Sequence, residues 1–265
     1  MQHSASRHGN RYDLFGWDYA TLNPLTGAEV AWHLGWAERT GGPILGLACG
    51  TARLLCRMAE AGHAVTGLDL SEAMLDLARA SVRALPLAAR GRVDLVRGDM
   101  ACFDLGRRFG LVILADNSFR ELSTRRELGR CLRAVRRHLR PDGKLLITER
   151  RFRASLYRGG VRELGWSEPK VNLRTGDTVR RRGRIRLHKH GRRASGVFEY
   201  EVSRPDGTTQ RVACPWSAPI LDLEDYLALF RQAGFATEVY ADYSMRVGRE
   251  EGDLWCFVCT PTGIA

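Results

Sequence analysis

Short apolar segments alternate with segments of helical periodicity along the first 150 residues of the chain. The apolar segments lie at 44–47, 64–69, 93–97, 111–115 and 144–148. The segment at 111–115 is continuously apolar, which is typical of a strand buried on both faces of a parallel sheet. Between the apolar segments, apolar positions recur at helical spacing, as at Leu128, Leu132 and Val135. The alternation predicts an α/β fold built on a parallel sheet.

The last third of the chain continues this pattern after an interruption. Residues 151–219 show period-two alternation, as at 197–202, and a Pro-Asp-Gly turn at 205–207, so we expect antiparallel strands with one apolar face. A helix is predicted over 223–233, with strands over 235–240 and 254–260. An insertion after the fifth strand emerges at the carboxyl edge of the sheet, so it is interpreted as a β-rich lid that selects the substrate.

The stretch Ile44-Leu45-Gly46-Leu47-Ala48-Cys49-Gly50-Thr51-Ala52-Arg53 ends the first strand and begins a helix. Its small residues allow a ligand to approach the backbone, and the helix N-terminus offers unpaired N–H donors. A phosphate-loop NTPase is excluded because no Lys follows the last glycine-like position, and Ala48 and Ala52 break the Gly-x-Gly-x-x-Gly pattern of dinucleotide sites.

This stretch resembles motif I of the class I S-adenosylmethionine (SAM) methyltransferases, with Gly46 at the usual acidic position and Ala52 at the last glycine. The resemblance implies a Rossmann-like, doubly wound, seven-stranded sheet whose last strand is antiparallel, with the β-rich lid inserted. The implied parts are an N-terminal cap segment (1–43), a SAM-binding core (44–150), the inserted lid or substrate subdomain (151–219) and a C-terminal completion of the sheet (220–265).

The resemblance also implies the cofactor, SAM, its product S-adenosylhomocysteine, and their binding residues. Asp69 ends the second strand, 19 residues after Gly50, at the spacing of the acidic residue that accepts both ribose hydroxyls of a nucleoside cofactor. By the same resemblance, Asp99 accepts from the adenine amine. The expected cofactor-binding residues are Gly46, Ala48, Cys49, Gly50, Arg53, Asp69, Leu70, Met74, Asp99, Met100 and Asp116.

Residues 116–122 follow the fourth strand and are interpreted as the place of the chemistry. They resemble the Asn-Ser-Phe-x-His-Leu stretch of small-molecule N-methyltransferases, including the aminosugar and glycine types, with Glu121 at the histidine position. Glu121 is therefore a candidate proton acceptor, or else a solvated residue at a helix start. The proposed catalytic residues are Glu121, Asn117 and Tyr19, and the proposed substrate residues are Tyr12, Tyr19, Asn117 and Arg120.

The aromatic segment from Tyr12 to Tyr19 has two interpretations. In methyltransferases that this chain resembles, a Tyr-Asp…Tyr segment folds over the cofactor. Alternatively, these rings pack the N-terminal segment onto the core.

Composition and charge indicate the cellular compartment that we expect for the protein, and they leave the interpretation of the fold unchanged. The 265 residues carry a net charge of +11, mostly from arginine, and the densest basic run spans 180–186. No apolar run is long enough for a membrane span, and the N-terminus is polar, so we expect a cytoplasmic protein without a membrane partner. Seven scattered cysteines indicate reduced thiols. Cys256 and Cys259 point to opposite faces of a strand, and no metal site is expected.

Three functions remain as hypotheses, and the first is preferred. It is transfer of a methyl group from SAM to an amine or hydroxyl of a small molecule by in-line displacement, by a monomer or homodimer. The second is an RNA methyltransferase that uses the arginine run, although no prolines of an amino-methyltransferase motif follow the fourth strand. The third is a SAM-binding protein without catalysis, which the substitutions at Gly46 and Ala52 suggest.

Overall fold

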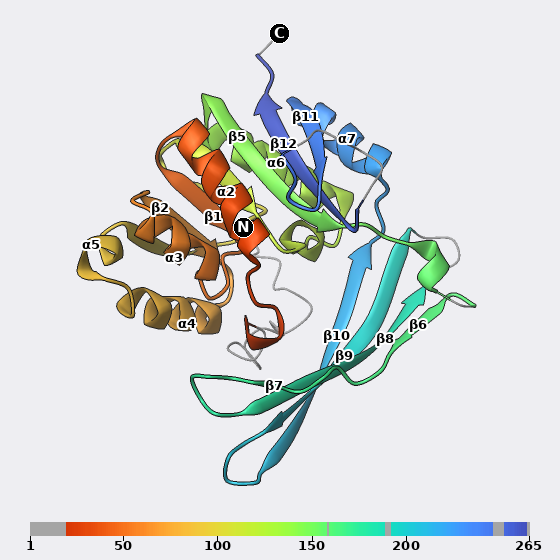
Figure 1. Cartoon of the computed structure of the whole chain (residues 1–265). Coiled ribbons are helices and arrows are strands. Elements are labelled where there is room, and N and C mark those ends of the chain that lie inside the picture. The colour runs from red at the N-terminus through yellow and green to blue at the C-terminus, as the bar shows by residue number, and fades with distance from the viewer. Residues whose placement is uncertain (1–19, 158, 189–191, 246–251, 264–265) are drawn as a thin grey trace, which may run out of the picture.

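The computed structural model describes residues 20–157, 159–188, 192–245 and 252–263, and it contains two sheets. The larger has seven strands in the order β11-β12-β5-β4-β1-β2-β3 (Figure 1). Its strands are β1 (Ile44–Leu47), β2 (Val65–Asp69), β3 (Val93–Arg97), β4 (Phe109–Leu114), β5 (Leu139–Arg150), β11 (Phe235–Ala241) and β12 (Leu254–Pro261). Only β12 runs antiparallel to its neighbours in this sheet. The predicted Rossmann-like, doubly wound sheet is confirmed.

Helices cover both faces of this sheet, as a parallel sheet requires. One face packs α6 (Arg125–His138) and α7 (Leu223–Gln232). The other packs α2 (Gly27–Thr40), α3 (Arg53–Glu60) and α4 (Glu72–Arg83), and a short α5 (Leu87–Arg90) follows. Strand β12 contributes to both faces, since Cys259 packs with α6 and α7 whereas Cys256 packs with α2 and α3. These two thiols therefore point in opposite directions, as predicted for a strand.

Strand β5 is longer than the sequence predicts. It pairs Leu139 with Phe109, and regular pairing resumes only at Lys144 and Leu111 after a register shift. The Pro-Asp-Gly stretch at 141–143, which precedes the predicted strand, is thus accommodated as an irregularity within β5. Gly143 belongs there because an added Cβ would lie 3.0 Å from the carbonyl oxygen of Gly110.

The segment after β5 forms a second, antiparallel sheet that extends away from the core (Figure 1). It contains β6 (Val161–Leu164), β8 (Thr178–Leu187), β9 (Arg193–Ser203) and β10 (Thr209–Pro219), with β7 (Lys170–Val171) paired to β8. We call it the insertion sheet. Its apolar face carries Val179, Tyr200, Val202 and Cys214, and Leu22, which precedes α2, packs against them.

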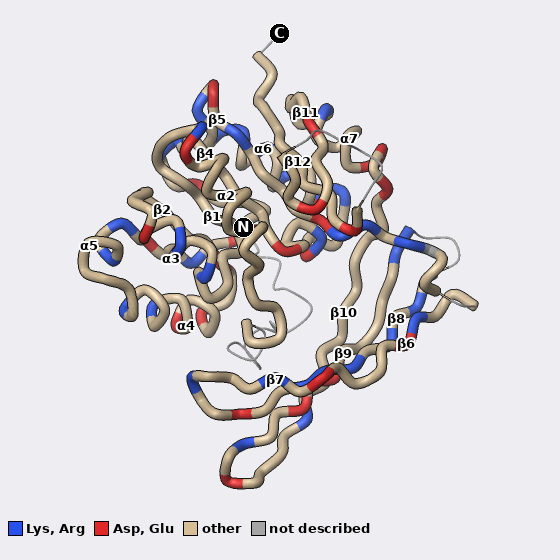
Figure 2. The backbone as a smooth tube through the Cα atoms, viewed as in Figure 1, with Lys and Arg blue, Asp and Glu red and all other residues tan. Residues whose placement is uncertain are grey.

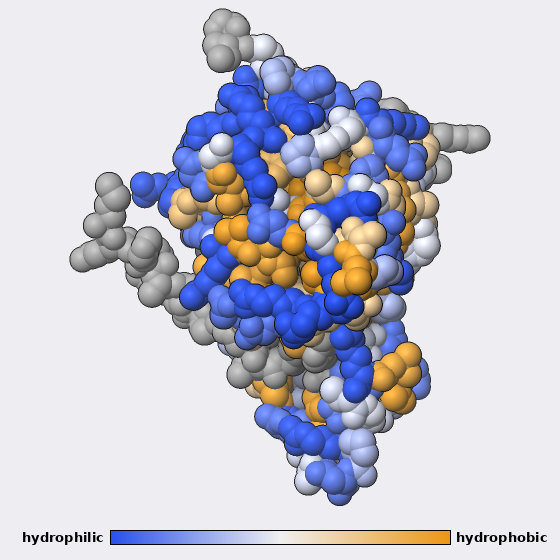
Figure 3. Space-filling view, turned by 90° about the vertical axis from the view of Figure 1, so that its left-hand side faces the viewer, coloured by the Kyte–Doolittle hydropathy of each residue, from blue (hydrophilic) through white to orange (hydrophobic). Residues whose placement is uncertain are grey.

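The surface of the molecule is largely hydrophilic and carries both basic and acidic side chains. On the side that bears α4 and α5, hydrophilic side chains dominate, with apolar side chains visible between them (Figure 3). Basic and acidic positions lie close together along the insertion sheet (Figure 2). No helix in the described ranges has both the length and the apolar character needed to cross a membrane.

Candidate active site

Strained backbone positions gather at one edge of the seven-stranded sheet. Six non-glycine residues have positive φ in the part of the chain that the structure describes: Ala48, Ala52, Asp116, Asn117, Asp242 and Tyr243. They occupy the segments that follow β1, β4 and β11, whose carboxyl ends share an edge of the sheet. Such conformations cost about 1–3 kcal/mol each and cluster at ligand sites. This edge is where an open α/β sheet binds ligands.

Asp69 ties the turn after β1 to the turn after β2. Its carboxylate accepts a hydrogen bond from the Gly50 N–H at 2.7 Å and another from the Ser71 N–H at 2.9 Å. The side chain is largely buried, with 9% of the residue exposed. The two bonds hold the carboxylate at the carboxyl end of β2, where a ribose is expected to bind. The ribose contact of Asp69 stays a prediction, while its structural role is a finding.

Arg53, the first residue of α3, reaches across to the turn after β4. One of its terminal nitrogens, Nη2, lies 2.7 Å from the Asp116 carboxylate. The other, Nη1, is buried and has no hydrogen-bond partner among the described residues. A buried guanidinium nitrogen without an acceptor is costly, so this atom fits an anionic ligand group at the predicted cofactor site.

The turn after β4 is fixed by its neighbour, β5. The N–H groups of Asp116 and Asn117 donate to the Oγ1 and carbonyl oxygen of Thr148, at 3.0 and 3.1 Å. The side-chain oxygen of Asn117 accepts from the Arg150 N–H at 2.7 Å. Asn117, predicted to contact the substrate, therefore uses this oxygen to hold the turn. Glu121, the predicted proton acceptor, lies exposed at the end of a 3₁₀ helix (Ser118–Glu121).

Arg120 lies in an ion pair rather than free at a substrate site. Its Nε lies 2.6 Å from the fully buried carboxylate of Glu149, and its Nη2 donates to the carbonyl oxygen of Arg150 at 2.7 Å. The Tyr226 hydroxyl donates to the same Glu149 oxygen at 3.3 Å. Burial raises the pKa of Glu149, and Arg120 opposes that rise. Substrate contact by Arg120 stays a prediction, since the pair occupies its Nε.

The adenine end of the predicted site is more open. Asp99 is exposed and accepts from the Ala101 N–H at 2.8 Å, and Met100 packs partly against the core. Leu70 leaves 48% of its surface exposed beside Asp69, as a residue that an adenine ring would cover. Met74, by contrast, is buried, with 3% of the residue exposed. Its N–H donates a hydrogen bond to the hydroxyl of Ser71, the N-cap of α4.

The turn after β1 carries the remaining predicted cofactor residues. Cys49 is half-buried, and burial raises the pKa of its thiol well above its usual range, so it is a neutral packing group. At Gly46 an added Cβ would lie 2.9 Å from a methyl carbon of Leu55. The predicted residues Tyr12 and Tyr19 lie outside the described residues. Within the described ranges, no group of three or more potential metal ligands occurs.

Two residues that sequence reasoning missed face Arg53 and Asp116. Glu29 in the first turn of α2 is 7% exposed, and Tyr243 follows β11. Burial raises the pKa of Glu29; Arg53 lowers it, Asp116 raises it, and a hydrogen bond from Tyr243 lowers it. Burial, with Glu29 next, raises the pKa of Tyr243. One signal was available: Glu29 precedes Trp32, His33 and Trp36 at helical spacing, which places a carboxylate on the apolar face of α2.

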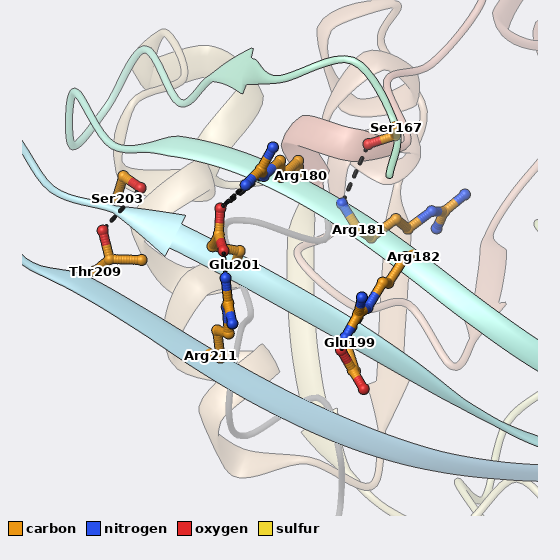
Figure 4. A network of polar contacts seen from close by, with 9 residues as sticks. All are labelled: Ser167, Arg180, Arg181, Arg182, Glu199, Glu201, Ser203, Thr209 and Arg211. Atoms are coloured by element: carbon orange, nitrogen blue, oxygen red, sulfur yellow. Dashed lines mark hydrogen bonds and ion pairs between the residues drawn. The ribbon is translucent and has the colours of Figure 1, made fainter. Parts of the chain in front are cut away.

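The densest basic run is largely paired within the insertion sheet (Figure 4). Arg180 and Arg211 both donate to Glu201, at 2.6 and 2.8 Å, and Arg182 donates to Glu199 at 2.6 Å. The guanidinium groups of Arg180 and Arg182 also lie over the Trp166 ring, at 4.7 and 4.8 Å from its centroid. These arginines therefore stabilise the sheet's polar face and are not free cations.

Comparison with known proteins agrees with the predicted resemblance to methyltransferases. A family model described as "Methyltransferase domain" matches residues 44–143. The chain is 28% identical over 235 residues to the dTDP-3-amino-3,4,6-trideoxy-alpha-D-glucopyranose N,N-dimethyltransferase of Streptomyces venezuelae, covering 87% of this chain and 91% of that protein.

Solved structures agree over nearly the whole chain. The sugar N-methyltransferase KedS8 from Streptoalloteichus sp superimposes with a TM-score of 0.70 at 27% identity, covering 99% of this chain and 97% of that one. A SAM-dependent methyltransferase from Clostridium acetobutylicum shares the fold, with a TM-score of 0.77 at 16% identity over 96% of this chain and 100% of that one. The motif, the sheet order and these likenesses confirm the predicted resemblance to the class I SAM-dependent methyltransferases, and residues 44–143 form a methyltransferase domain.

Proposed function

We propose that the chain methylates the amino group of a small, sugar-like molecule. The observation that carries this proposal is the likeness to an aminosugar N,N-dimethyltransferase over 91% of that protein's length. The likeness includes the insertion, which in this fold emerges beside the carboxyl edge of the sheet. Small-molecule acceptors also agree with the paired arginines of the insertion sheet, because a paired arginine releases fewer counterions from a polyanion.

In this proposal the turns after β1 and β2 hold the cofactor, and the turn after β4 receives the acceptor. When bound, SAM supplies a methyl group on a sulfonium that is already a good leaving group. The protein therefore has to position an unprotonated amine in line and exclude water. Strand β4 is the neighbour of β1 in the sheet, and Asp116 in the turn after β4 pairs with Arg53, the first residue of the helix that follows β1. Glu121 takes the amine proton to solvent.

The insertion sheet serves as the cover of the acceptor. It is attached near the turn after β4, where Arg193 of β9 donates to the carbonyl oxygen of Ser123 at 3.0 Å and to the Ser217 hydroxyl at 2.9 Å. Its apolar face carries the rings of Phe198 and Trp216, packed edge-on at 6.3 Å between centroids. An apolar wall beside the reacting amine would exclude water and favour the neutral amine.

A panel of acceptors tests the reaction directly. Purified protein is incubated with SAM and with nucleotide-linked amino deoxysugars, the matching hydroxyl sugars, free glycine and total RNA. We expect mass spectrometry to find one or two added methyl groups on the amino sugars only. Methylation of hydroxyl sugars, of glycine or of RNA alone would overturn the proposed acceptor class.

Glu121 is tested against a second exposed carboxylate. We expect Glu121→Gln to lower kcat/KM about 10²-fold or more, the usual contribution of a positioned proton acceptor, and to leave cofactor binding unchanged. Glu38→Gln, at the far end of α2, is the matched control and should keep wild-type kinetics. Equal kinetics for the two variants would remove Glu121 from the reaction.

A further inference from the structure

The acidic position of motif I cannot be filled from β1 in this chain. Gly46 stands there, and the space that its side chain would occupy holds Leu55 of α3, whose methyl carbon lies 2.9 Å from an ideal Cβ. Leu55 is itself buried at 3% exposure, within the α2–α3 side of the core. A carboxylate for the cofactor's amino group must therefore come from another element.

Glu29 provides a carboxylate at this end of the sheet. It lies in the first turn of α2, where the Thr26 hydroxyl accepts from its N–H at 3.1 Å. Its backbone carbonyl is bonded to His33 Nδ1 at 2.8 Å, so the turn that carries Glu29 is held at both ends. The side chain is buried among Arg53, Asp116 and Tyr243, which all act on its charge. A buried carboxylate close to a second one is costly without enough cationic partners.

Two acidic side chains and one arginine meet in this cluster. Glu29 and Asp116 together carry up to two negative charges, and Arg53 carries one positive charge, half of whose donor fork is engaged by Asp116. At the same time Nη1 of Arg53 lacks an acceptor. A ligand with both a cation and a carboxylate would bring the cation to the buried Glu29 carboxylate and the carboxylate to Nη1 of Arg53. The amino-acid end of SAM carries an α-ammonium and an α-carboxylate.

We propose that Glu29 takes over the role of the missing motif I acid: Glu29 and Asp116 hold the α-ammonium of SAM, and Nη1 of Arg53 donates to its α-carboxylate. Tyr243 orients Glu29 through its hydroxyl and is held by its strained backbone, since its φ is +60° and its N–H donates to the Cys256 sulfur at 3.4 Å. The proposal rests on the family assignment and not on the acceptor.

Calorimetric titration with two probes separates this role from a general structural one. S-adenosylhomocysteine carries the amino-acid end, and 5′-methylthioadenosine lacks both of its charged groups. We expect Glu29→Gln to weaken S-adenosylhomocysteine binding about 10- to 100-fold, the range for a lost charged hydrogen bond. Binding of 5′-methylthioadenosine should stay within about twofold of wild type, since base and ribose contacts are intact. Glu38→Gln is the control on the same helix and should change neither affinity.

A deaminated analogue of S-adenosylhomocysteine assigns the contact to the ammonium. In the wild type its affinity should be about tenfold or more below that of S-adenosylhomocysteine, and in Glu29→Gln this difference should largely disappear. Arg53→Gln should weaken the deaminated analogue as well, because that ligand keeps the carboxylate. An undiminished difference in Glu29→Gln would overturn the proposal, as would equal weakening of both probes.

Tyr243→Phe keeps the proposal testable if Glu29→Gln does not fold. Removing the hydroxyl frees Glu29 from its hydrogen bond, so S-adenosylhomocysteine should bind several-fold more weakly and 5′-methylthioadenosine as before. Unchanged affinity for both would overturn the proposal. None of these binding experiments contains the methyl acceptor. A wrong assignment of the acceptor would therefore be detected separately, in the turnover assay with the acceptor panel.

Discussion

The carboxylate of Asp69, at the end of β2, accepts the N–H of Gly50 in the turn after β1 at 2.7 Å. The bond joins residues 19 apart in the sequence and fixes the backbone beside the predicted ribose site. Asp69 therefore shapes the turn whether or not a ligand is bound. Its substitution is expected to have both a structural and a binding effect.

Asp69→Asn should lower the free energy of unfolding by about 1–3 kcal/mol, because Gly50 and Ser71 donate to different oxygens of Asp69 and an amide replaces one of these oxygens with an NH2 donor. It should also weaken S-adenosylhomocysteine and 5′-methylthioadenosine together, since both carry the ribose. Denaturant titration and calorimetry measure the two effects. The matched control is Asp94→Asn, an exposed carboxylate on β3 paired with Arg107. If Asp69→Asn behaves like this control, the ribose assignment is wrong.

Ala48→Gly should stabilise the protein by about 0.5–1 kcal/mol, because Ala48 has a φ of +49° that glycine adopts without a steric penalty. The same change at Ala80, inside α4, should destabilise by about 1 kcal/mol. Chemical unfolding of both variants compares the two signs directly. A loss of stability in Ala48→Gly as large as in Ala80→Gly would mean that the left-handed turn is not strained.

Arg120→Gln should destabilise the protein by about 3–5 kcal/mol, because it leaves the buried Glu149 without its cation. The comparison is Arg79→Gln, which removes a surface ion pair to Glu72 and Asp76 and should leave the stability close to that of the wild type. Thermal and denaturant unfolding measure both. Similar small losses in the two variants would show that the Arg120–Glu149 pair adds little to stability.

His33 should make the fold sensitive to acid. Burial lowers its pKa from 6.5 to about 4, so the unfolded chain binds a proton in this range that the folded chain does not. The contribution is fully present above pH 6.5 and is lost as the pH falls toward 4, by about 3 kcal/mol in total. In His33→Gln the drop in unfolding free energy between pH 7 and pH 4.5 should be smaller by about 2 kcal/mol. An equal drop in both proteins would assign the acid loss to other groups.

The sequence alone determined the sheet and the place of the site. Apolar runs such as 111–115 can be buried only between two layers of helices, so the alternation of strands and helices along the chain follows from periodicity, and the small residues after Leu47 mark the predicted ligand turn. The spacing of Asp69 from Gly50 placed two turns at one edge. These are local or nearly local signals, which a chain displays before it folds.

Only the tertiary structure decided which charges meet. Glu29, Arg53, Asp116 and Tyr243 come from α2, α3 and the segments after β4 and β11, and no periodicity links them. Arg120, a predicted substrate residue, is bonded to Glu149, 29 residues away, and the sequence did not indicate this pairing. Pairing of this kind depends on distances across the packed sheet and on burial, which sets how costly an unpaired charge is. A one-dimensional pattern contains neither quantity, so the electrostatics of the site appear only in the folded chain.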